Sequence, residues 1–248
     1  MTKLLDVSGL TKRYGGVLAC DDFALSVVPG SLHALIGPNG AGKSTAIGLL
    51  SGEIAADAGD IRFDGADITK IAMPARVKRG LVRSFQITSV LPHFSALENV
   101  ALVAQVHAGH SFRFWSDARR DRNLTDPAHA MLERVGLGLR AATQAQDLAH
   151  GEQRQLELAM ALMTGARMLL LDEPMAGLGQ TESRDMTELL AALKGSVTIL
   201  LVEHDMDAVA ALADQVSVMV AGQVIAEGSF ASMQANEAVR RAYLGEAA

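Results

Sequence analysis

The chain has 248 residues, of which 49% are hydrophobic and 20% charged, a composition typical of a folded globular protein and not of a disordered one. Its net charge of -6 argues against a general nucleic-acid-binding surface, which normally carries a basic excess. A single cysteine cannot form an internal disulfide, and no apolar run reaches the roughly 18 residues of a membrane span. We therefore expect a cytoplasmic protein in a reducing compartment.

Three strands are predicted in the first part of the chain. Residues 4–9 and 21–28 have the apolar spacing of half-buried strands, and residues 32–36 form a fully apolar run that predicts a buried strand. Between the first two, residues 13–16 have the composition of a turn that would expose the ring of Tyr14.

A glycine-rich segment, GPNGAGKST, follows the third strand and matches the phosphate-binding template G-x-x-x-x-G-K-[ST]. A helix is predicted over residues 44–50, so backbone N–H groups and the positive end of the helix can converge on an anion. Lys43 can reach the outer phosphates, and the Ser44 hydroxyl can bind Mg²⁺. The pattern therefore predicts a nucleoside triphosphate site made of Gly37, Pro38, Asn39, Gly40, Ala41, Gly42, Lys43, Ser44 and Thr45.

The middle of the chain changes from mixed to helical patterns. A strand at 60–63, a short helix at 74–79 and a strand at 81–85 are followed by helices at 96–106, 126–135 and 152–163. Pro127 is expected in the first turn of the second of these helices.

Residues 110–122 read HSFRFWSDARRDR and interleave aromatic and arginine side chains. This composition could suit nucleic acid or a membrane surface. In an acidic protein we favour a solvated helical face or an insert that docks a partner.

The last third of the chain alternates strands with helices. Strands are expected at 168–171 and 197–202, helices at 181–193 and 206–213, and a strand pair at 215–220 and 223–227 before two short helices that end at residue 244. This alternation indicates a mainly parallel sheet with antiparallel elements, into which the helical block is inserted.

Two acidic residues, Asp172 and Glu173, directly follow the buried strand predicted at 168–171. A carboxylate at this edge of the sheet is well placed to hold Mg²⁺, and we assign that role to Asp172. Glu173 points elsewhere and can act as the general base that polarises the attacking water.

Taken together, these motifs resemble the nucleotide-binding subunit of ABC transporters over nearly the whole chain. The resemblance implies one P-loop ABC ATPase domain over residues 1–248, with a nucleotide-binding core at 1–86 and 166–248 and an α-helical subdomain at 87–165. It also implies hydrolysis of ATP with Mg²⁺ as cofactor.

The resemblance assigns three further residues. Tyr14 matches the aromatic residue that stacks on adenine, Gln86 the glutamine that senses Mg²⁺ and faces the transmembrane subunit, and His204 the histidine near the γ-phosphate. The implied catalytic residues are then Glu173, His204 and Gln86, and the implied metal ligands are Ser44, Gln86 and Asp172.

The family signature, usually LSGGQ or LSGGE, corresponds here to Leu148, Ala149, His150, Gly151, Glu152 and Gln153. By resemblance, the helix behind it directs its N-terminal dipole at the γ-phosphate bound to the opposite protomer. Ala149 lacks the family's hydroxyl, and the lost hydrogen bond is worth on the order of 1.5–3 kcal/mol if it goes to a charged group. We therefore expect weaker sandwiching of the nucleotide but not abolished function. By resemblance, Gly179 stands where the family has an aspartate that helps to couple the two sites, so communication between the sites is expected to be affected while nucleotide binding is kept.

Several segments resemble the ATPase subunits of branched-chain amino-acid importers: the aromatic insert before Asp126, and residues 201–206, 224–228 and 242–245. This resemblance implies uptake of branched-chain amino acids or related small amides. It also implies a homodimer or a heterodimer with a paralogous ATPase, transmembrane permease subunits and a solute-binding protein, without nucleic acid. The chain would then lie on the inner face of the cell membrane, held there by the permease subunits.

Three alternatives remain at this stage. One is the ATPase of an exporter. Another is an ABC ATPase that acts on DNA or ribosomes, although the chain has no coiled-coil insertion, zinc motif or second cassette. The third is a regulator that binds ATP without turnover, as Ala149 and Gly179 suggest, although Glu173 and His204 argue against it.

Overall fold

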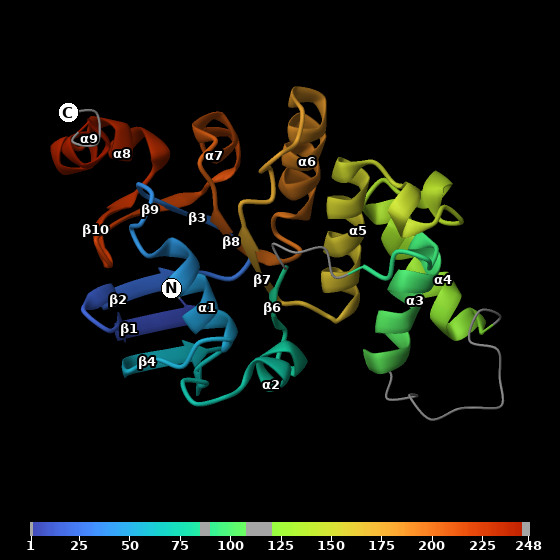
Figure 1. Cartoon of the computed structure of the whole chain (residues 1–248), viewed down its shortest axis with the longest axis horizontal. Coiled ribbons are helices and arrows are strands. Elements are labelled where there is room, and N and C mark those ends of the chain that lie inside the picture. Colours follow the sequence, from blue (N-terminus) through green and yellow to red (C-terminus); the bar gives the residue numbers. More distant parts are fainter. Residues whose placement is uncertain (1, 85–89, 108–120, 245–248) are drawn as a thin grey trace. The chain divides into compact units, whose positions relative to one another are not determined.

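The computed structural model describes residues 2–84, 90–107 and 121–244 of the chain (Figure 1). The chain divides into two compact units. The first unit consists of Met1–Arg83, Arg167–Met175 and Leu190–Ala248, and the second of Ser84–Ala166 and Ala176–Leu189.

A six-stranded sheet forms the centre of the first unit, in the order β10-β9-β3-β8-β7-β6. Neighbouring strands are parallel except β10, which is antiparallel to β9. The bounds are β3 Leu32–Ile36, β6 Leu81–Arg83, β7 Met168–Asp172, β8 Thr198–Val202, β9 Gln215–Val220 and β10 Gln223–Gly228. Every residue of β3, β7 and β8 is buried, as expected for apolar strands covered on both faces.

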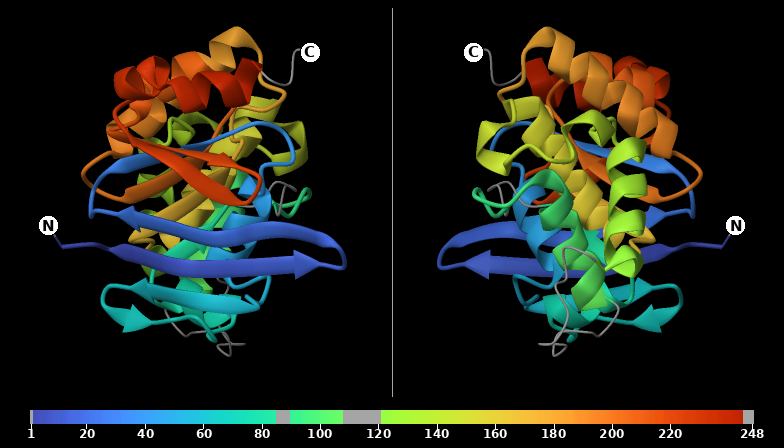
Figure 2. Two further views of the ribbon diagram at one scale, coloured as in Figure 1. Left: turned by 90° about the vertical axis from the view of Figure 1, so that its left-hand side faces the viewer. Right: turned by 90° about the vertical axis from the view of Figure 1, so that its right-hand side faces the viewer.

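A second, antiparallel sheet of the first unit has the order β2-β1-β4-β5, and Figure 2 shows its long strands lying side by side. Its strands are β1 Leu5–Tyr14, β2 Val17–Val27, β4 Ala58–Phe63 and β5 Ala66–Asp67. The predicted end of the first strand at residue 9 was wrong. Register shifts interrupt the pairing of β1 with β2 beyond Val7, and they disrupt the alternation that sequence patterns rely on.

Helices pack on the sheets of the first unit to form its core. α1 (Lys43–Ser51) contributes Ile47, Leu49 and Leu50 to a cluster that contains residues of both sheets, such as Phe23 and Leu170. The short helix α2 (Met73–Lys78) precedes β6. A separate cluster joins α7 (Met206–Leu212), α8 (Phe230–Ala235) and α9 (Glu237–Leu244) to β3 and β9.

The second unit is helical. It contains α3 (Ala96–His107), α4 (Arg122–Arg134), the short 3-10 helices η2 (Gly138–Arg140) and η3 (Ala145–Asp147), α5 (His150–Met163) and residues 180–189 of α6 (Gln180–Leu193). The helices α3, α4 and α5 all contact one another. Within the described ranges, none of the helices has the length and apolar character needed to cross a bilayer.

The predicted start of α4 at residue 126 was also wrong. The Asp121 carboxylate accepts a hydrogen bond from the Asn123 N–H at 3.0 Å, so the helix begins at Arg122. Pro127 therefore lies inside the helix and not in its first turn.

Candidate nucleotide site

The glycine-rich segment, Asp172, Glu173 and His204 come together at one edge of the six-stranded sheet. The glycine-rich segment follows the last residue of β3, Asp172 is the last residue of β7, and His204 lies just beyond β8. Because these neighbouring strands are parallel, their carboxyl ends meet at the same edge.

Two glycines of the segment are required by close backbone approach. Gly37 has φ 155° and Gly42 has φ 104°. A Cβ atom at Gly37 would overlap the carbonyl oxygen of Met219, and one at Gly42 would overlap that of Ala19. The loop therefore passes against β9 and β2 with no room for side chains at these positions.

The start of α1 is suited to an anion. Gly42 is its N-cap and provides no side-chain acceptor, and the first turn of this fully described helix contains no acidic residue. Its N–H groups and the positive end of its dipole are thus left for a phosphate. The Lys43 ammonium donates to the carbonyl oxygens of Gly37 at 2.6 Å and Pro38 at 2.9 Å, which holds the cation over the loop.

Asp172 is held by Arg83. Its side chain is 1% exposed, and its Oδ2 accepts a hydrogen bond from Arg83 Nη2 at 3.1 Å. Burial raises the pKa of Asp172, against the opposing effect of the Arg83 charge. The other oxygen, Oδ1, is buried and has no hydrogen-bond partner within the described part of the chain.

That unpaired oxygen fits a cation ligand. The described residues contain no group of three or more His, Cys, Asp or Glu side chains that could hold a metal by themselves. Mg²⁺ is commonly bound by one or two carboxylates together with waters and substrate phosphates, so a single carboxylate beside a phosphate loop matches its chemistry.

Glu173 and His204 form a close pair. Glu173 Oε1 lies 2.8 Å from His204 Nε2, and both side chains are partly exposed. Glu173 has φ 52°, a conformation uncommon for a residue with a Cβ atom, and its N–H donates to the Val202 carbonyl at 2.9 Å. The pair thus joins the loop after β7 to the loop after β8.

Sequence reasoning missed Glu203, the first residue after β8. Its buried carboxylate accepts hydrogen bonds from the backbone N–H groups of Met175, His204 and Asp205. An acidic residue that directly follows a fully apolar strand was the available signal, but its partners could not be read from the pattern.

Tyr14 lies at the end of β1 with 48% of its surface exposed. Lys12 Nζ is 5.5 Å from the centroid of its ring, and Lys12 is paired with Asp57 at 2.8 Å. The ring is therefore exposed enough to stack on a planar ligand, with a cation beside it.

The signature segment lies in the second unit, where Ala149 is the N-cap of α5. Ala149 offers no side-chain oxygen to the helix, but its N–H donates to Glu152 at 2.9 Å. The N–H groups of Gly151 and Gly179 both donate to Glu182, at 3.2 Å and 3.1 Å. Glu182, which was not predicted, thus joins the two segments that depart from the family pattern.

Gln86, predicted to be a catalytic residue and a metal ligand, lies outside the described residues. The same holds for residues 110–120 of the aromatic run and for Gly245.

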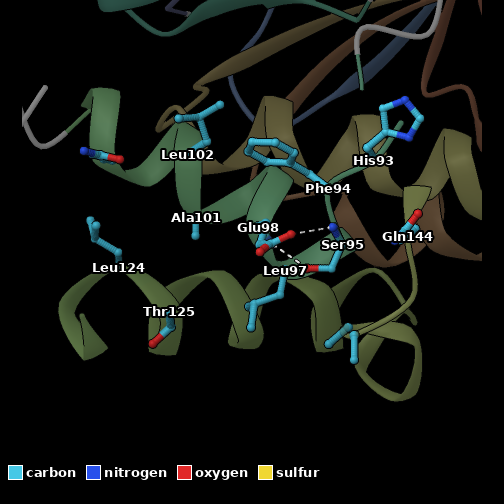
Figure 3. Close-up of a pocket in the computed structure, with 13 residues that line it drawn as sticks. His93, Phe94, Ser95, Leu97, Glu98, Ala101, Leu102, Leu124, Thr125 and Gln144 are labelled. Atoms are coloured by element: carbon cyan, nitrogen blue, oxygen red, sulfur yellow. Dashed lines mark hydrogen bonds between the residues drawn. The ribbon is translucent and has the colours of Figure 1, made fainter. Parts of the chain in front are cut away.

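The second unit also contains a cavity of about 730 Å³ between α3 and α4. Figure 3 shows Leu97 and Ala101 of α3 pointing toward α4. Ser95 and Glu98 at this cavity bond to each other's backbone N–H groups in a capping box that begins α3. The lining is mainly apolar, so this cavity does not match the charged phosphates of a nucleotide.

Comparisons with known proteins give matches over most of the chain. Residues 20–176 match the model of the ABC transporter family, and residues 223–248 match that of the branched-chain amino acid ATP-binding cassette transporter. The chain is 39% identical to the high-affinity branched-chain amino acid transport ATP-binding protein BraF of Pseudomonas aeruginosa, over 98% of both chains. It is 38% identical to LivG of Escherichia coli, a protein with the same description, again over 98% of both.

A solved structure confirms the predicted α/β fold. The chain resembles the ADP conformation of MJ1267, an ATP-binding cassette of an ABC transporter, with a TM-score of 0.88 and 30% identity over 99% of this chain and 100% of that one. On these grounds the chain belongs to the ABC transporter family of ATP-binding proteins and is an ATPase.

Proposed function

We propose that this ATPase powers the uptake of branched-chain amino acids or related small amides through permease subunits at the inner face of the cell membrane. The observation that carries the proposal is the match to BraF and LivG over nearly the full length of each chain. The match of residues 223–248 to a branched-chain amino acid transporter model supports it independently of the cassette motifs earlier in the chain.

In this proposal the nucleotide lies on the glycine-rich loop, with its adenine against Tyr14 and its phosphates at the N-terminus of α1. Ser44 and Asp172 would hold Mg²⁺, together with Gln86. When bound, the ion would neutralise charge on the phosphates. Lys43 would turn from the loop carbonyls toward the outer phosphates.

Glu173 is proposed as the general base. Its carboxylate takes a proton from the water whose oxygen forms a bond to the γ-phosphorus, while the bond to the leaving β-phosphate oxygen breaks. His204, at 2.8 Å from Glu173, orients that carboxylate toward the γ-phosphate.

Two chains, or this chain and a paralogue, are proposed to close head to tail over two nucleotides. The signature segment of each would then face the phosphates bound by the other. ATP drives closure to the extent that it binds the closed state better than the open one. A permease and a solute-binding protein would complete the importer. Residues 87–165 would form the helical subdomain, and residues 1–86 and 166–248 the nucleotide-binding core.

The test is uptake of labelled leucine, isoleucine and valine by cells that lack this gene. We expect uptake to be restored by the wild-type chain and by Glu188→Gln, a change at an exposed surface pair of α6, but not by Glu173→Gln. Purified Glu173→Gln should still bind ATP. Normal uptake without the gene, or accumulation of a solute that cells would otherwise export, would reject the import proposal.

A further inference from the structure

We propose that Glu203 is a positioning residue for ATP hydrolysis, which holds the loops that carry Glu173 and His204 in a fixed relation. The inference rests on the roles proposed above for those two residues. Glu203 itself faces away from solvent, with 3% of its surface exposed, and is not expected to touch the nucleotide.

Each oxygen of the Glu203 carboxylate accepts hydrogen bonds from a different loop. Oε1 accepts the Met175 N–H at 2.9 Å, two positions after Glu173. Oε2 accepts the His204 N–H at 2.9 Å and the Asp205 N–H at 3.4 Å. Since all these groups lie in the first unit, one buried side chain joins the loop after β7 to the loop after β8.

The surface pair of Glu173 and His204 depends on this link. Their side chains meet at 2.8 Å, but both are partly exposed, and an exposed pair is weak by itself. Glu173 also has φ 52°, and such conformations persist only where surrounding contacts hold them. Glu203 provides such contacts on both sides of the pair, from the interior of the protein.

The chemistry requires a carboxylate. An ionised carboxylate only accepts hydrogen bonds and can serve both loops at once, whereas an amide has one accepting oxygen and an N–H₂ group. In Glu203→Gln the amide N–H₂ would face a backbone N–H on one side, so one loop would lose its anchor while the side chain kept its volume.

The experiment compares Glu203→Gln with the wild-type chain in steady-state ATPase assays, with ATP affinity measured separately by calorimetry. We expect kcat to fall by about tenfold or more, as for loss of a charge-assisted hydrogen bond, with ATP affinity nearly unchanged. The matched control is Glu157→Gln, which alters another buried glutamate, on α5 in the second unit, and should leave kcat unchanged.

A double-mutant comparison separates positioning from general loss of structure. In a Glu173→Gln background, Glu203→Gln should cause little further loss of kcat, because its effect passes through Glu173. An equal tenfold loss in that background, or an unchanged kcat in the single variant, would overturn the inference. If Glu203→Gln does not fold, Glu203→Asp, which keeps both oxygens on a shorter stem, is put through the same two comparisons.

The experiments distinguish a wrong assignment of Glu173 as general base from a wrong positioning role for Glu203. If Glu173→Gln hydrolyses ATP at the wild-type rate, the assignment of Glu173 is wrong. If Glu173→Gln keeps only a low, measurable rate and only the Glu203 comparisons fail, the positioning role is wrong.

Discussion

Arg83 Nη2 lies 3.1 Å from Asp172 Oδ2, so a guanidinium rests against the carboxylate proposed to hold Mg²⁺. Arg83 also pairs with Glu53, and its own side chain is only 11% exposed. In this arrangement the arginine provides positive charge that a metal ion would otherwise contribute.

Removing the positive charge of Arg83 should destabilise the protein unless Mg²⁺ replaces that charge. We expect Arg83→Met to lower the free energy of unfolding by about 3 kcal/mol in EDTA, because a buried carboxylate loses its partner. Added Mg²⁺ should then raise the Tm of the variant more than that of the wild type. Thermal unfolding with and without Mg²⁺ measures both effects.

The control for this prediction is Arg167→Met, since Arg167 pairs with Asp64 where both side chains are more than half exposed. It should cost less than about 1 kcal/mol and show no added response to Mg²⁺. An equal response to Mg²⁺ in the Arg83 variant and the wild type would contradict a metal role for Asp172.

Glu182 joins Gly151 of the signature segment to Gly179, and both N–H groups hold the pKa of its carboxylate below the ordinary value. We expect Glu182→Ala to loosen α5 from this loop and to reduce the fraction of ATP-dependent dimer. Light scattering of the Glu173→Gln chain, with and without Glu182→Ala, measures that fraction in Mg-ATP and in Mg-ADP. Glu188→Ala on the same helix is the control, and an undiminished dimer fraction in the Glu182 variant would rule out this link.

The Arg76 side chain bonds to backbone carbonyls in the last turn of α1. Its guanidinium donates to the carbonyl oxygens of Leu49 and Leu50, and also to those of Ile71 and Thr69. Burial lowers the pKa of Arg76 to about 10, which leaves it charged at neutral pH.

Arg76→Lys keeps the charge but loses the planar arrangement of donors, so several buried carbonyls become unsatisfied. We expect a loss of about 2–3 kcal/mol in the free energy of unfolding, measured by urea denaturation. The exposed Arg79→Lys should be neutral, and a neutral result for Arg76→Lys would show that a point charge is sufficient there.

His33 should make folding sensitive to acid. It is 1% exposed, its Nε2 lies 2.8 Å from Ser217 Oγ, and burial lowers the pKa of His33 to about 4. The unfolded chain takes up this proton near pH 6.5, so between about pH 6.5 and pH 4 the unfolded state binds more protons and stability falls as the pH falls.

The contribution of His33 to this loss is at most about 3 kcal/mol. His33→Gln should remove it, so that urea denaturation at pH 7 and pH 4 gives a smaller difference than in the wild type. His93→Gln, at an exposed histidine, should keep the wild-type difference. Identical differences in all three proteins would show that His33 does not titrate as described.

The sequence by itself determined the elements whose signals are local. The apolar runs of β3, β7 and β8 were predicted to within about a residue, because a strand buried on both faces needs no partner to be recognised. The glycine-rich loop and Asp172 could also be predicted from local sequence, because their chemistry depends on neighbouring positions and on the strand before each of them.

Only the tertiary structure decided the contacts between distant segments. Met175 and Glu203 are separated by 28 positions, Arg83 and Asp172 by 89, and His33 and Ser217 by 184. No periodicity in a sequence window encodes such pairs, because they form only when the sheet places neighbouring parallel strands side by side. The residues that orient the site therefore emerged from sheet order and packing, while those expected to bind phosphate were already evident in the chain.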